Sequence, residues 1–279
     1  MEYEGKVAVI TGAASGIGRS VALALARLGT DIVVADLDDT RLGEVRQEIE
    51  SMGRRALAIH CDVSKDADVD NLAAQTLSTL GKVDILMNNA GVGVRGKVEN
   101  ISIKDWGWIL GINLLGVIRG VHAFLPHKLK RGSGYIINTA SAAGLVASEP
   151  PPLAIRNIPY STAKFGVVGF SEGLYGYLRP KGIMVSVLCP GMVTTNLGFS
   201  SRYVGSDQEI ADMNVEGEEM FNINTPGVIE SDDVAQIVVK AMKEKRFFIL
   251  THQEVQAHLK SRGQDIEKLE KHLQDVFGG

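Results

Sequence analysis

The sequence predicts an α/β fold, a doubly wound parallel sheet with helices on both faces. Short apolar, β-branched runs alternate with stretches of helical period. The runs are apolar at consecutive positions, as in strands that are buried on both faces. Crossovers between parallel strands are right-handed, which winds the helices onto both faces. Because no repeat, low-complexity tract or linker interrupts this pattern, we expect one domain at residues 1–250 and a C-terminal helical extension at 251–279.

The predicted strands and helices follow one another along the chain. Strands are expected at 6–11, 31–36, 55–60, 83–87, 135–139, 183–188 and 247–250. Helices are expected at 16–28, 40–52, 66–80, 103–130, 160–178 and 232–245. Glycine follows the first three helices, at Gly29, Gly53 and Gly81, which is a common way for a helix to end.

Two segments interrupt the alternation. Residues 148–157 contain three consecutive prolines, which remove backbone donors and exclude a helix. Residues 192–230 are mixed in character and broken by Gly and Pro, and a loop of that length in a compact domain usually forms a lid or binding loop. Nearer the C-terminus, amphipathic helical spacing predicts a further helix through Ile266, Leu269, Leu273 and Val276.

Composition excludes several classes of function. Lys and Arg number 29 against 33 Asp and Glu, a net charge of −4, which gives no electrostatic footprint for nucleic acid. We expect no membrane association, because no stretch approaches about 18 apolar residues and no signal peptide is evident. Cys61 and Cys189 are too few for a disulfide framework, so a cytoplasmic location is expected. His122 and His127 have no matching partners, so no metal site is predicted.

A glycine-rich stretch, TGAASGIG at residues 11–18, lies where the first strand turns into the first helix. Glycines let the backbone turn tightly and approach a ligand. The helix N-terminus behind them presents unpaired N–H groups, which can bind a pyrophosphate. The spacing of Gly12, Gly16 and Gly18 differs from the general G-x-G-x-x-G fingerprint. The alternative is a plain strand–helix turn.

Polar residues follow the next three strands. Asp36 ends the second strand, 18 residues after Gly18. A carboxylate there can bind a ribose 2′-hydroxyl and would repel a 2′-phosphate, which favours NAD over NADP. Arg19 is the nearest opposing charge, but we expect it to point along the first helix. Asp62 and the NNAG stretch at 88–91 lie at carboxyl ends of strands, where ligands bind such sheets. Each of these acidic or amide residues could instead form a turn.

Tyr160 and Lys164 are four residues apart, so they share one face of the helix predicted at 160–178. A tyrosine has a pKa near 10, and a cation close by can lower that pKa by ~1–3. Tyr160 could then act as a general acid or base. The hydroxyl of Ser141 could polarise a carbonyl, and the amide of Asn113 could hold a water. The alternative is two surface residues on an ordinary helix.

Taken together in this order, these motifs resemble the short-chain dehydrogenase/reductase family, in its single-domain branch, over about residues 5–250. The resemblance implies a Rossmann-type fold, a nicotinamide cofactor and hydride exchange between an alcohol and a carbonyl. It implies that Tyr160 is the acid/base, Ser141 the partner of the substrate oxygen, Lys164 a ribose ligand and Asn113 the support of a proton-relay water. For the adenosine half of the cofactor it implies Gly12, Ser15, Ile17, Asp36, Asp62, Val63 and Asn89, and near the nicotinamide Pro190, Val193 and Thr194. The segment between Ser141 and Tyr160 and the region beyond residue 250 are longer than in many relatives.

These observations predict an NAD-dependent enzyme that interconverts a secondary alcohol and a ketone. The alternatives are an NADPH-preferring carbonyl reductase and a non-catalytic cofactor-binding relative, because a fold does not determine a function. Apolar residues in 192–230 indicate either a hydrophobic substrate or packing of the lid itself; they are Met192, Val193, Leu197, Phe199, Tyr203, Met213, Met220 and Phe221. We also expect a homo-oligomer, a tetramer or dimer, paired through the helices at 103–130 and 160–178.

Overall fold

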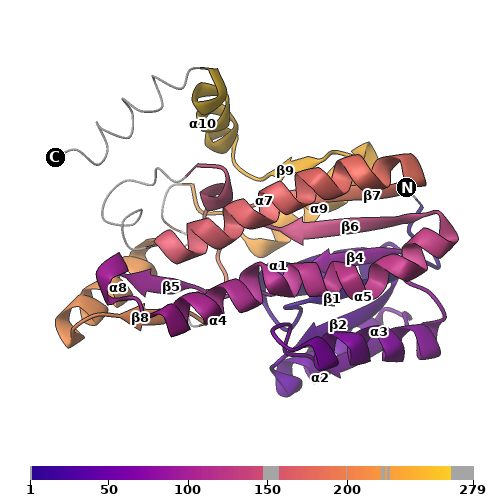
Figure 1. Ribbon diagram of the computed structural model, residues 1–279. Helices are drawn as coiled ribbons and strands as arrows, with labels where there is room; N and C mark the ends of the chain where they lie inside the picture. Colours follow the sequence, from indigo (N-terminus) through magenta and orange to yellow (C-terminus); the bar gives the residue numbers. More distant parts are fainter. Residues whose placement is uncertain (1, 147–156, 199, 221–223, 225–226, 265–279) are drawn as a thin grey trace.

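The computed structural model describes residues 2–146, 157–198, 200–220, 224 and 227–264. Within them, a seven-stranded parallel sheet forms the centre of the molecule in the order β3-β2-β1-β4-β6-β7-β9 (Figure 1). The strands are β1 (Val7–Thr11), β2 (Asp31–Asp36), β3 (Ala56–His60), β4 (Ile85–Asn88), β6 (Gly134–Thr139), β7 (Ile183–Cys189) and β9 (Phe248–Leu250). The predicted doubly wound parallel sheet is therefore confirmed.

Helices cover both faces of the sheet because successive residues in each strand point to opposite sides. In β1, Ala8 and Ile10 join the core beneath one set of helices, and Val7 and Val9 join the core beneath the other. The first face carries α1 (Gly16–Arg27), α2 (Asp39–Ser51) and α9 (Ser231–Glu244). The second carries α3 (Asp66–Leu80), α4 (Ile103–Asn113), α5 (Leu115–Arg131) and α7 (Ile158–Leu178).

The strand order reverses between β1 and β4. In β1, Val9 pairs with Val33 of β2 on one side and with Leu86 of β4 on the other. The chain winds outward from β1 through β2 to β3, then returns to start β4 beside β1. Connections leave in opposite directions at such a switch point, so a crevice opens at the carboxyl ends of the two strands. The glycine-rich stretch and the NNAG stretch both emerge there.

The single helix expected at 103–130 is wrong, because the chain forms two helices that meet at Leu114. At this junction Leu114 stays in the right-handed helical region, but its φ of −112° and ψ of −58° lie away from ideal helical values. The stretch Ile103–Arg131 is also apolar enough, by length and composition, to pass as a membrane span, which corrects the sequence expectation. In the structure, α5 packs on β4 and α3 and buries residues including Val117, Val121 and Phe124. The core helix of a folded domain passes the same test.

The segment 192–230 is more ordered than a loop. It contains β8 (Arg202–Val204) and α8 (Asp207–Met220), and β8 pairs with β5 (Val94–Gly96) in a separate two-stranded sheet. A parallel bridge between Val193 and Ile229 joins its two ends. In the C-terminal extension, α10 (Gln253–Gln264) follows β9. The Pro-rich residues 148–156 and the predicted helix through Ile266, Leu269, Leu273 and Val276 lie outside the described residues.

Candidate active site

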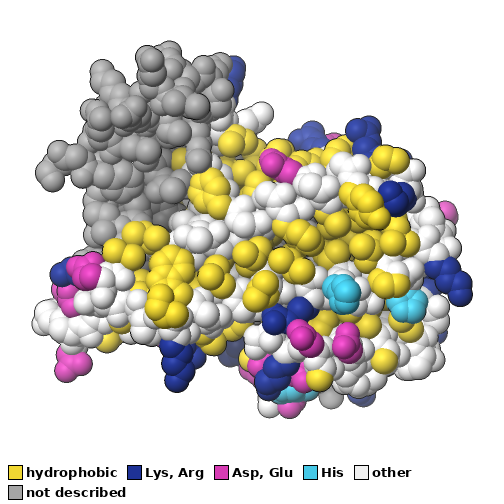
Figure 2. All heavy atoms as spheres, in the orientation of Figure 1, with side chains coloured by type: hydrophobic (Ala, Val, Ile, Leu, Met, Phe, Trp, Pro, Cys, Tyr) yellow, Lys and Arg dark blue, Asp and Glu magenta, His cyan; other side chains and the backbone are white. Residues whose placement is uncertain are grey.

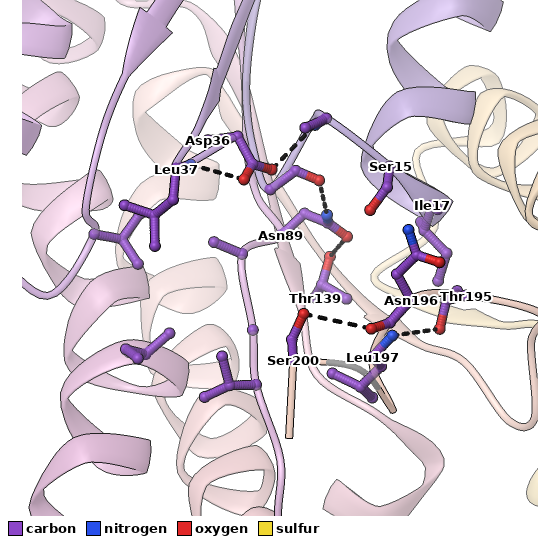
Figure 3. Close-up of a pocket in the computed structure, with 18 of the residues that line it drawn as sticks. Ser15, Ile17, Asp36, Leu37, Asn89, Thr139, Thr195, Asn196, Leu197 and Ser200 are labelled. Carbon is purple, nitrogen blue, oxygen red and sulfur yellow. Dashed lines mark hydrogen bonds between the residues drawn. The ribbon is translucent and has the colours of Figure 1, made fainter. Parts of the chain in front are cut away.

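A cleft of about 730 Å³ lies at the carboxyl ends of the strands, along the crevice between β1 and β4 (Figure 3). Most of the residues that the sequence singled out line it. They are Gly12, Ser15, Ile17, Asp36, Asp62, Val63, Asn89, Ser141, Tyr160, Lys164, Pro190 and Val193. Two others, Asn113 and Thr194, do not line it.

The glycine-rich turn packs too tightly to accept side chains. A Cβ added at Gly12, whose φ is +64°, would lie 2.7 Å from the Cα of Ala90, and one at Gly18 would lie 2.2 Å from the Gly12 carbonyl oxygen. Asn89 fixes the turn, because its Nδ2 donates to the Gly12 carbonyl over 3.1 Å. Ser15 begins α1 with an extended backbone, and the first turn of α1 carries no acidic residue. Ser15, Gly16 and Ile17 line the cleft, so the N-terminus of α1 faces it, and such an end can bind an anion.

Asp36 lies at the end of β2 with both carboxylate oxygens held by the backbone. Its Oδ2 accepts from Ala14 N over 3.0 Å, and its Oδ1 accepts from Leu37 N over 2.7 Å. These bonds join the end of β2 to the glycine-rich turn and hold the carboxylate at the wall of the cleft (Figure 3). Arg19 forms an ion pair with Glu48, so its guanidinium reaches across to α2 rather than along α1 as expected. The other nearby cation, Arg41, lines the cleft but pairs with Asp38 at 3.5 Å.

Asp62 and Cys61 form the wall beyond the end of β3. Burial alone would raise the pKa of Asp62, but hydrogen bonds from Ser64 and the ammonium of Lys65 outweigh it and hold that pKa below its usual range. Asp62 therefore stays ionised, with Oδ1 accepting from the Ser64 hydroxyl over 2.7 Å. Burial, and then the nearby carboxylates, raise the pKa of the Cys61 thiol to about 12. The Cys61 thiol is therefore unreactive and only lines this part of the cleft.

Tyr160 and Lys164 lie on the first turns of α7 and are buried to different extents. Lys164 is only 3% exposed, and its Nζ donates to the Thr139 carbonyl over 2.9 Å. Nζ lies 5.5 Å from the centroid of the Tyr160 ring. Burial lowers the pKa of Lys164 to about 8, opposed by the nearby Cys189. The Oγ of Ser141 accepts from Ala143 N over 3.2 Å, which caps a short 3₁₀ turn after β6. All three residues line the cleft.

The Asn113 amide bonds to the backbone of Val92, and its support of a proton-relay water stays a prediction. The side chain is fully buried. Its Oδ1 accepts from Val92 N over 2.9 Å, and its Nδ2 donates to Val92 O over 2.8 Å. The amide thus bonds both backbone groups of Val92, which follows the NNAG stretch, as a neighbouring strand would. Asn113 is also the last residue of α4 rather than the middle of a long helix.

Residues after β7 form the remaining wall of the cleft. Pro190 and Val193 line it, and so does Thr195 where Thr194 was predicted. The Oγ1 of Thr194 is buried and has no hydrogen-bond partner among the described residues. Contact between Thr194 and a nicotinamide stays a prediction. Thr195 also packs against α1, since a Cβ added at Gly16 would lie 3.2 Å from its Cγ2.

Sequence reasoning missed several residues of the cleft. Thr139 and Ala140 follow β6 directly, and the rule that ligands bind at carboxyl ends of strands could have found them. Trp108, Ile112 and Leu197 form an apolar wall near Tyr160, but they come from α4 and the segment 192–230, where no short motif points to them. Over the described residues, no group of three or more His, Cys, Asp or Glu side chains could hold a metal ion.

Comparison with known proteins identifies the family. Residues 6–203 match the family model described as short chain dehydrogenase. The chain belongs to the short-chain dehydrogenase family. The chain is 30% identical over 271 residues to a CLA biosynthesis dehydrogenase/reductase of Lactiplantibacillus plantarum, covering 94% of this chain and 93% of that protein. It is 35% identical over 195 residues to the (2S)-[(R)-hydroxy(phenyl)methyl]succinyl-CoA dehydrogenase subunit BbsD of Thauera aromatica, covering 70% and 76% of the two chains.

Solved structures of short-chain dehydrogenases show the same arrangement. The chain resembles a short-chain dehydrogenase/reductase from Burkholderia phymatum in complex with NAD, with a TM-score of 0.86, 36% identity and 96% of each chain covered. This chain therefore has the Rossmann-type fold of the short-chain dehydrogenases, with Tyr160, Lys164, Ser141 and Asp36 all lining its cleft.

Proposed function

We propose that this short-chain dehydrogenase transfers hydride between NAD and a secondary alcohol or ketone. The observation that carries the proposal is the placement of Tyr160, Lys164 and Ser141 together on the cleft that also receives the glycine-rich turn and Asp36. The glycine-rich turn, the anion-binding end of α1 and the ionised Asp36 fit the pyrophosphate and ribose of a dinucleotide. The non-catalytic alternative is disfavoured, because a binding protein would not require a phenol beside a buried ammonium.

In the proposed reaction, Tyr160 exchanges a proton with the substrate oxygen. Bound NAD supplies the hydride acceptor for alcohol oxidation, or as NADH the donor for ketone reduction. The Lys164 ammonium favours the phenolate form of Tyr160, because a nearby cation stabilises an anion. Ser141 accepts from Ala143 N, so its own O–H can be donated to the substrate oxygen and orient the carbon toward the cofactor.

The preference for NAD over NADP rests on Asp36. Its carboxylate is fixed on the cleft wall by Ala14 N and Leu37 N, where it can accept from a ribose hydroxyl and would repel a 2′-phosphate. The NADP alternative has one supporting observation, which is that Arg41 also lines the cleft. We favour NAD because Asp38 already pairs with that guanidinium.

The substrate is proposed to be a hydrophobic alcohol or ketone. Trp108, Ile112, Val92 and Leu197 line the cleft together with Tyr160. Of the other apolar residues in the segment 192–230, Met213 is 3% exposed and does not line the cleft, so only part of this apolar set faces the cleft. The name of the T. aromatica relative describes a secondary alcohol that carries a phenyl group, which supports the same class.

The proposal is tested by following absorbance of NADH with purified protein and a panel of secondary alcohols of increasing apolar size. We expect turnover with NAD⁺, and a kcat/KM that rises with apolar size. Tyr160→Phe removes the phenolic proton but keeps the ring, so turnover should fall by ~10²–10⁴-fold while NAD binding persists. Near-normal turnover in Tyr160→Phe would overturn the assigned mechanism, and better use of NADP by the wild type would overturn the cofactor assignment.

A further inference from the structure

His252 is a side chain outside the cleft whose hydrogen bonds determine its tautomer. It lies between β9 and α10, with Nε2 2.8 Å from the Gly227 carbonyl oxygen. Its Nδ1 lies 3.3 Å from Gly191 N and 2.6 Å from the Thr251 hydroxyl. Gly191 N also donates to that hydroxyl oxygen over 3.1 Å, so Nδ1 and Thr251 share this N–H. Because a carbonyl only accepts, Nε2 carries the hydrogen, and Nδ1 of the neutral ring is then an acceptor. That acceptor faces the Gly191 N–H, so one neutral imidazole satisfies both contacts.

The two backbone partners of His252 lie at opposite ends of the segment 192–230. Gly191 directly precedes that segment, and Gly227 lies near its end. The two ends also bond to each other, since Ile229 N donates to Met192 O over 3.2 Å and Thr194 N donates to Ile229 O over 3.0 Å. His252 adds a connection from the C-terminal side of the sheet, so both ends are tied to the β9–α10 junction.

The imidazole also lies directly behind the cleft wall. A Cβ added at Gly191 would lie 2.6 Å from His252 Nδ1, so the ring packs flat against the Gly191 Cα. Gly191 and Pro190 line the cleft on their other side. The Pro190 carbonyl accepts from Ala142 N over 2.7 Å, next to Ser141. Two hydrogen bonds, joined through the Pro190–Gly191 peptide bond, thus connect His252 to the backbone next to Ser141.

We propose that His252 is a positioning residue, which uses its two ring nitrogens to fix the Pro190–Gly191 turn and the returning end of the segment 192–230. It touches no reacting group and acts through Gly191 and Gly227. The inference deepens the proposed function and rests on it for its kinetic consequence. The structural part, a link between the two ends, holds for the cofactor-free protein.

Two substitutions of His252 by an amide residue test the contacts of the two ring nitrogens one at a time. In His252→Asn the side-chain oxygen can stand near the position of Nδ1 and accept from Gly191, but the side chain is too short to reach Gly227. In His252→Gln the side-chain nitrogen can stand near Nε2 and donate to Gly227, but nothing replaces Nδ1. His252→Ala removes both contacts, and His127→Ala, on an exposed position of α5, is the matched control.

Hydrogen exchange on the cofactor-free protein is the first measurement. His252→Ala should raise amide exchange about 3- to 10-fold in peptides covering 188–194 and 227–231, the effect of one lost hydrogen bond. His252→Asn should restore protection mainly at 188–194, and His252→Gln mainly at 227–231. Equal protection in the alanine variant and wild type would overturn the proposal, as would identical exchange patterns in the asparagine and glutamine variants.

NAD affinity and steady-state kinetics are the second measurement. His252→Ala should weaken NAD binding about 3- to 10-fold. His252→Asn should recover most of that loss, and His252→Gln should not, because only the Gly191 turn lines the cleft. Equal losses in both amide variants would indicate simple space filling and overturn the positioning role. If wild-type protein does not bind NAD at all, the proposed function fails, and the exchange measurement still decides whether His252 joins the two ends.

Discussion

Tyr160 and Lys164, four positions apart on α7, lie in two very different environments. Lys164 is 3% exposed and bound to the Thr139 carbonyl, whereas Tyr160 is half-buried and lines the cleft. Two surface residues on an ordinary helix would both be solvated, so that alternative is wrong. The buried ammonium is kept next to the ring of Tyr160 by its bond to the end of β6.

The Tyr160–Lys164 pair should therefore behave as one unit. Lys164→Ala should lower turnover and NAD affinity together, because it removes both the tuning charge and a proposed ribose ligand. Tyr160→Phe should lower turnover alone. Residues that act as a unit give losses that do not add, so the double variant should lose less than the product of the two single losses. Steady-state kinetics and NAD titration of the three variants check this, and additive losses would contradict the coupling.

Asp36 should determine the preference of the enzyme for NAD over NADP. Asp36→Ala combined with Leu37→Arg should shift preference from NAD toward NADP, because it removes a repulsive carboxylate and adds a partner for a phosphate. It should also cost about 1 kcal/mol of stability, since Ala14 N and Leu37 N lose their acceptor. The ratio of kcat/KM for the two cofactors is the measurement. Asp39→Ala, an exposed carboxylate on α2, is the control and should leave the ratio unchanged.

At the scale of elements, the two-stranded sheet of β5 and β8 joins the segment 192–230 to α4. Arg202 on β8 lies with its guanidinium carbon 3.7 Å from the centroid of the Trp108 ring. The same side chain forms an ion pair with Asp105, in the first turn of α4, at 3.1 Å. Trp108 also lines the cleft beside Tyr160. The segment thus fixes the aromatic wall of the proposed substrate site.

Arg202→Ala should leave the Trp108 side chain less firmly positioned at the cleft. A cation–π contact is worth roughly 0.5–2 kcal/mol, so KM for bulky apolar alcohols should rise by about 2- to 30-fold. NAD affinity should stay unchanged, because Arg202 is not among the residues that line the cleft. Tryptophan fluorescence gives an independent measurement of the environment of Trp108. Arg46→Ala, which breaks an exposed pair on α2, is the control. An unchanged KM across the alcohol panel would show that Arg202 does not position Trp108.

Most strands of the large sheet were predictable because they are nearly continuous buried runs, such as residues 7–11 and 31–36. The strands β5 and β8 were not, because each has three residues and their pairing joins parts of the chain about 100 residues apart. The break at Leu114 was missed because no proline marks it. The neighbouring Asn113 bonds to Val92, which is a tertiary contact that local sequence does not reveal.

The candidate site was more predictable than the segments that cover it. Its motifs lie next to strand ends, where the topology brings Gly12 and Asn89 within hydrogen-bond distance. His252 and Trp108 carry no such signal, because a lone histidine or tryptophan usually packs without a specific function. Their positions depend on how β9 and β8 approach the cleft, which only the structure reveals.

At the scale of the whole molecule, a buried charge cluster lies at the edge of the sheet opposite the cleft. Lys128 is fully buried, and its Nζ donates to the Asp84 carbonyl over 3.0 Å. Asp84 pairs with Arg131 at 2.8 Å, which together with Val7 N outweighs burial and holds its pKa below the usual range. Burial, and to a lesser extent Arg131, lowers the pKa of Lys128 to about 7, against the opposing effect of Asp84.

This cluster predicts that stability rises with pH above neutrality. Between about 7 and 10.5 the unfolded chain binds a proton at residue 128 that the folded chain lacks, so the free energy of unfolding increases with pH. Lys128→Met should remove this contribution. The wild type should gain stability over the variant by on the order of 2 kcal/mol between pH 7 and 9. Urea unfolding at both pH values is the measurement, and parallel pH dependences would contradict a lowered pKa at Lys128.

The face formed by α4, α5 and α7 is where we expect the chain to pair with a second copy. Large apolar side chains are exposed on the helices where pairing is proposed, including Ile103 at 85%, Leu115 at 44% and Tyr177 at 55%. Figure 2 shows apolar side chains gathered across the face formed by α4, α5 and α7. Exposed patches of this kind usually bind a partner, and we propose that a second copy of the chain covers this patch.

Sedimentation velocity should show a dimer or tetramer at micromolar concentration. Leu115→Glu combined with Tyr177→Glu should shift it toward monomer, because pairing would bury two carboxylates. Leu28→Glu, at the end of α1 on the opposite face of the sheet, should leave assembly unchanged. A monomeric wild type, or equal dissociation by both sets of substitutions, would show that this face does not pair.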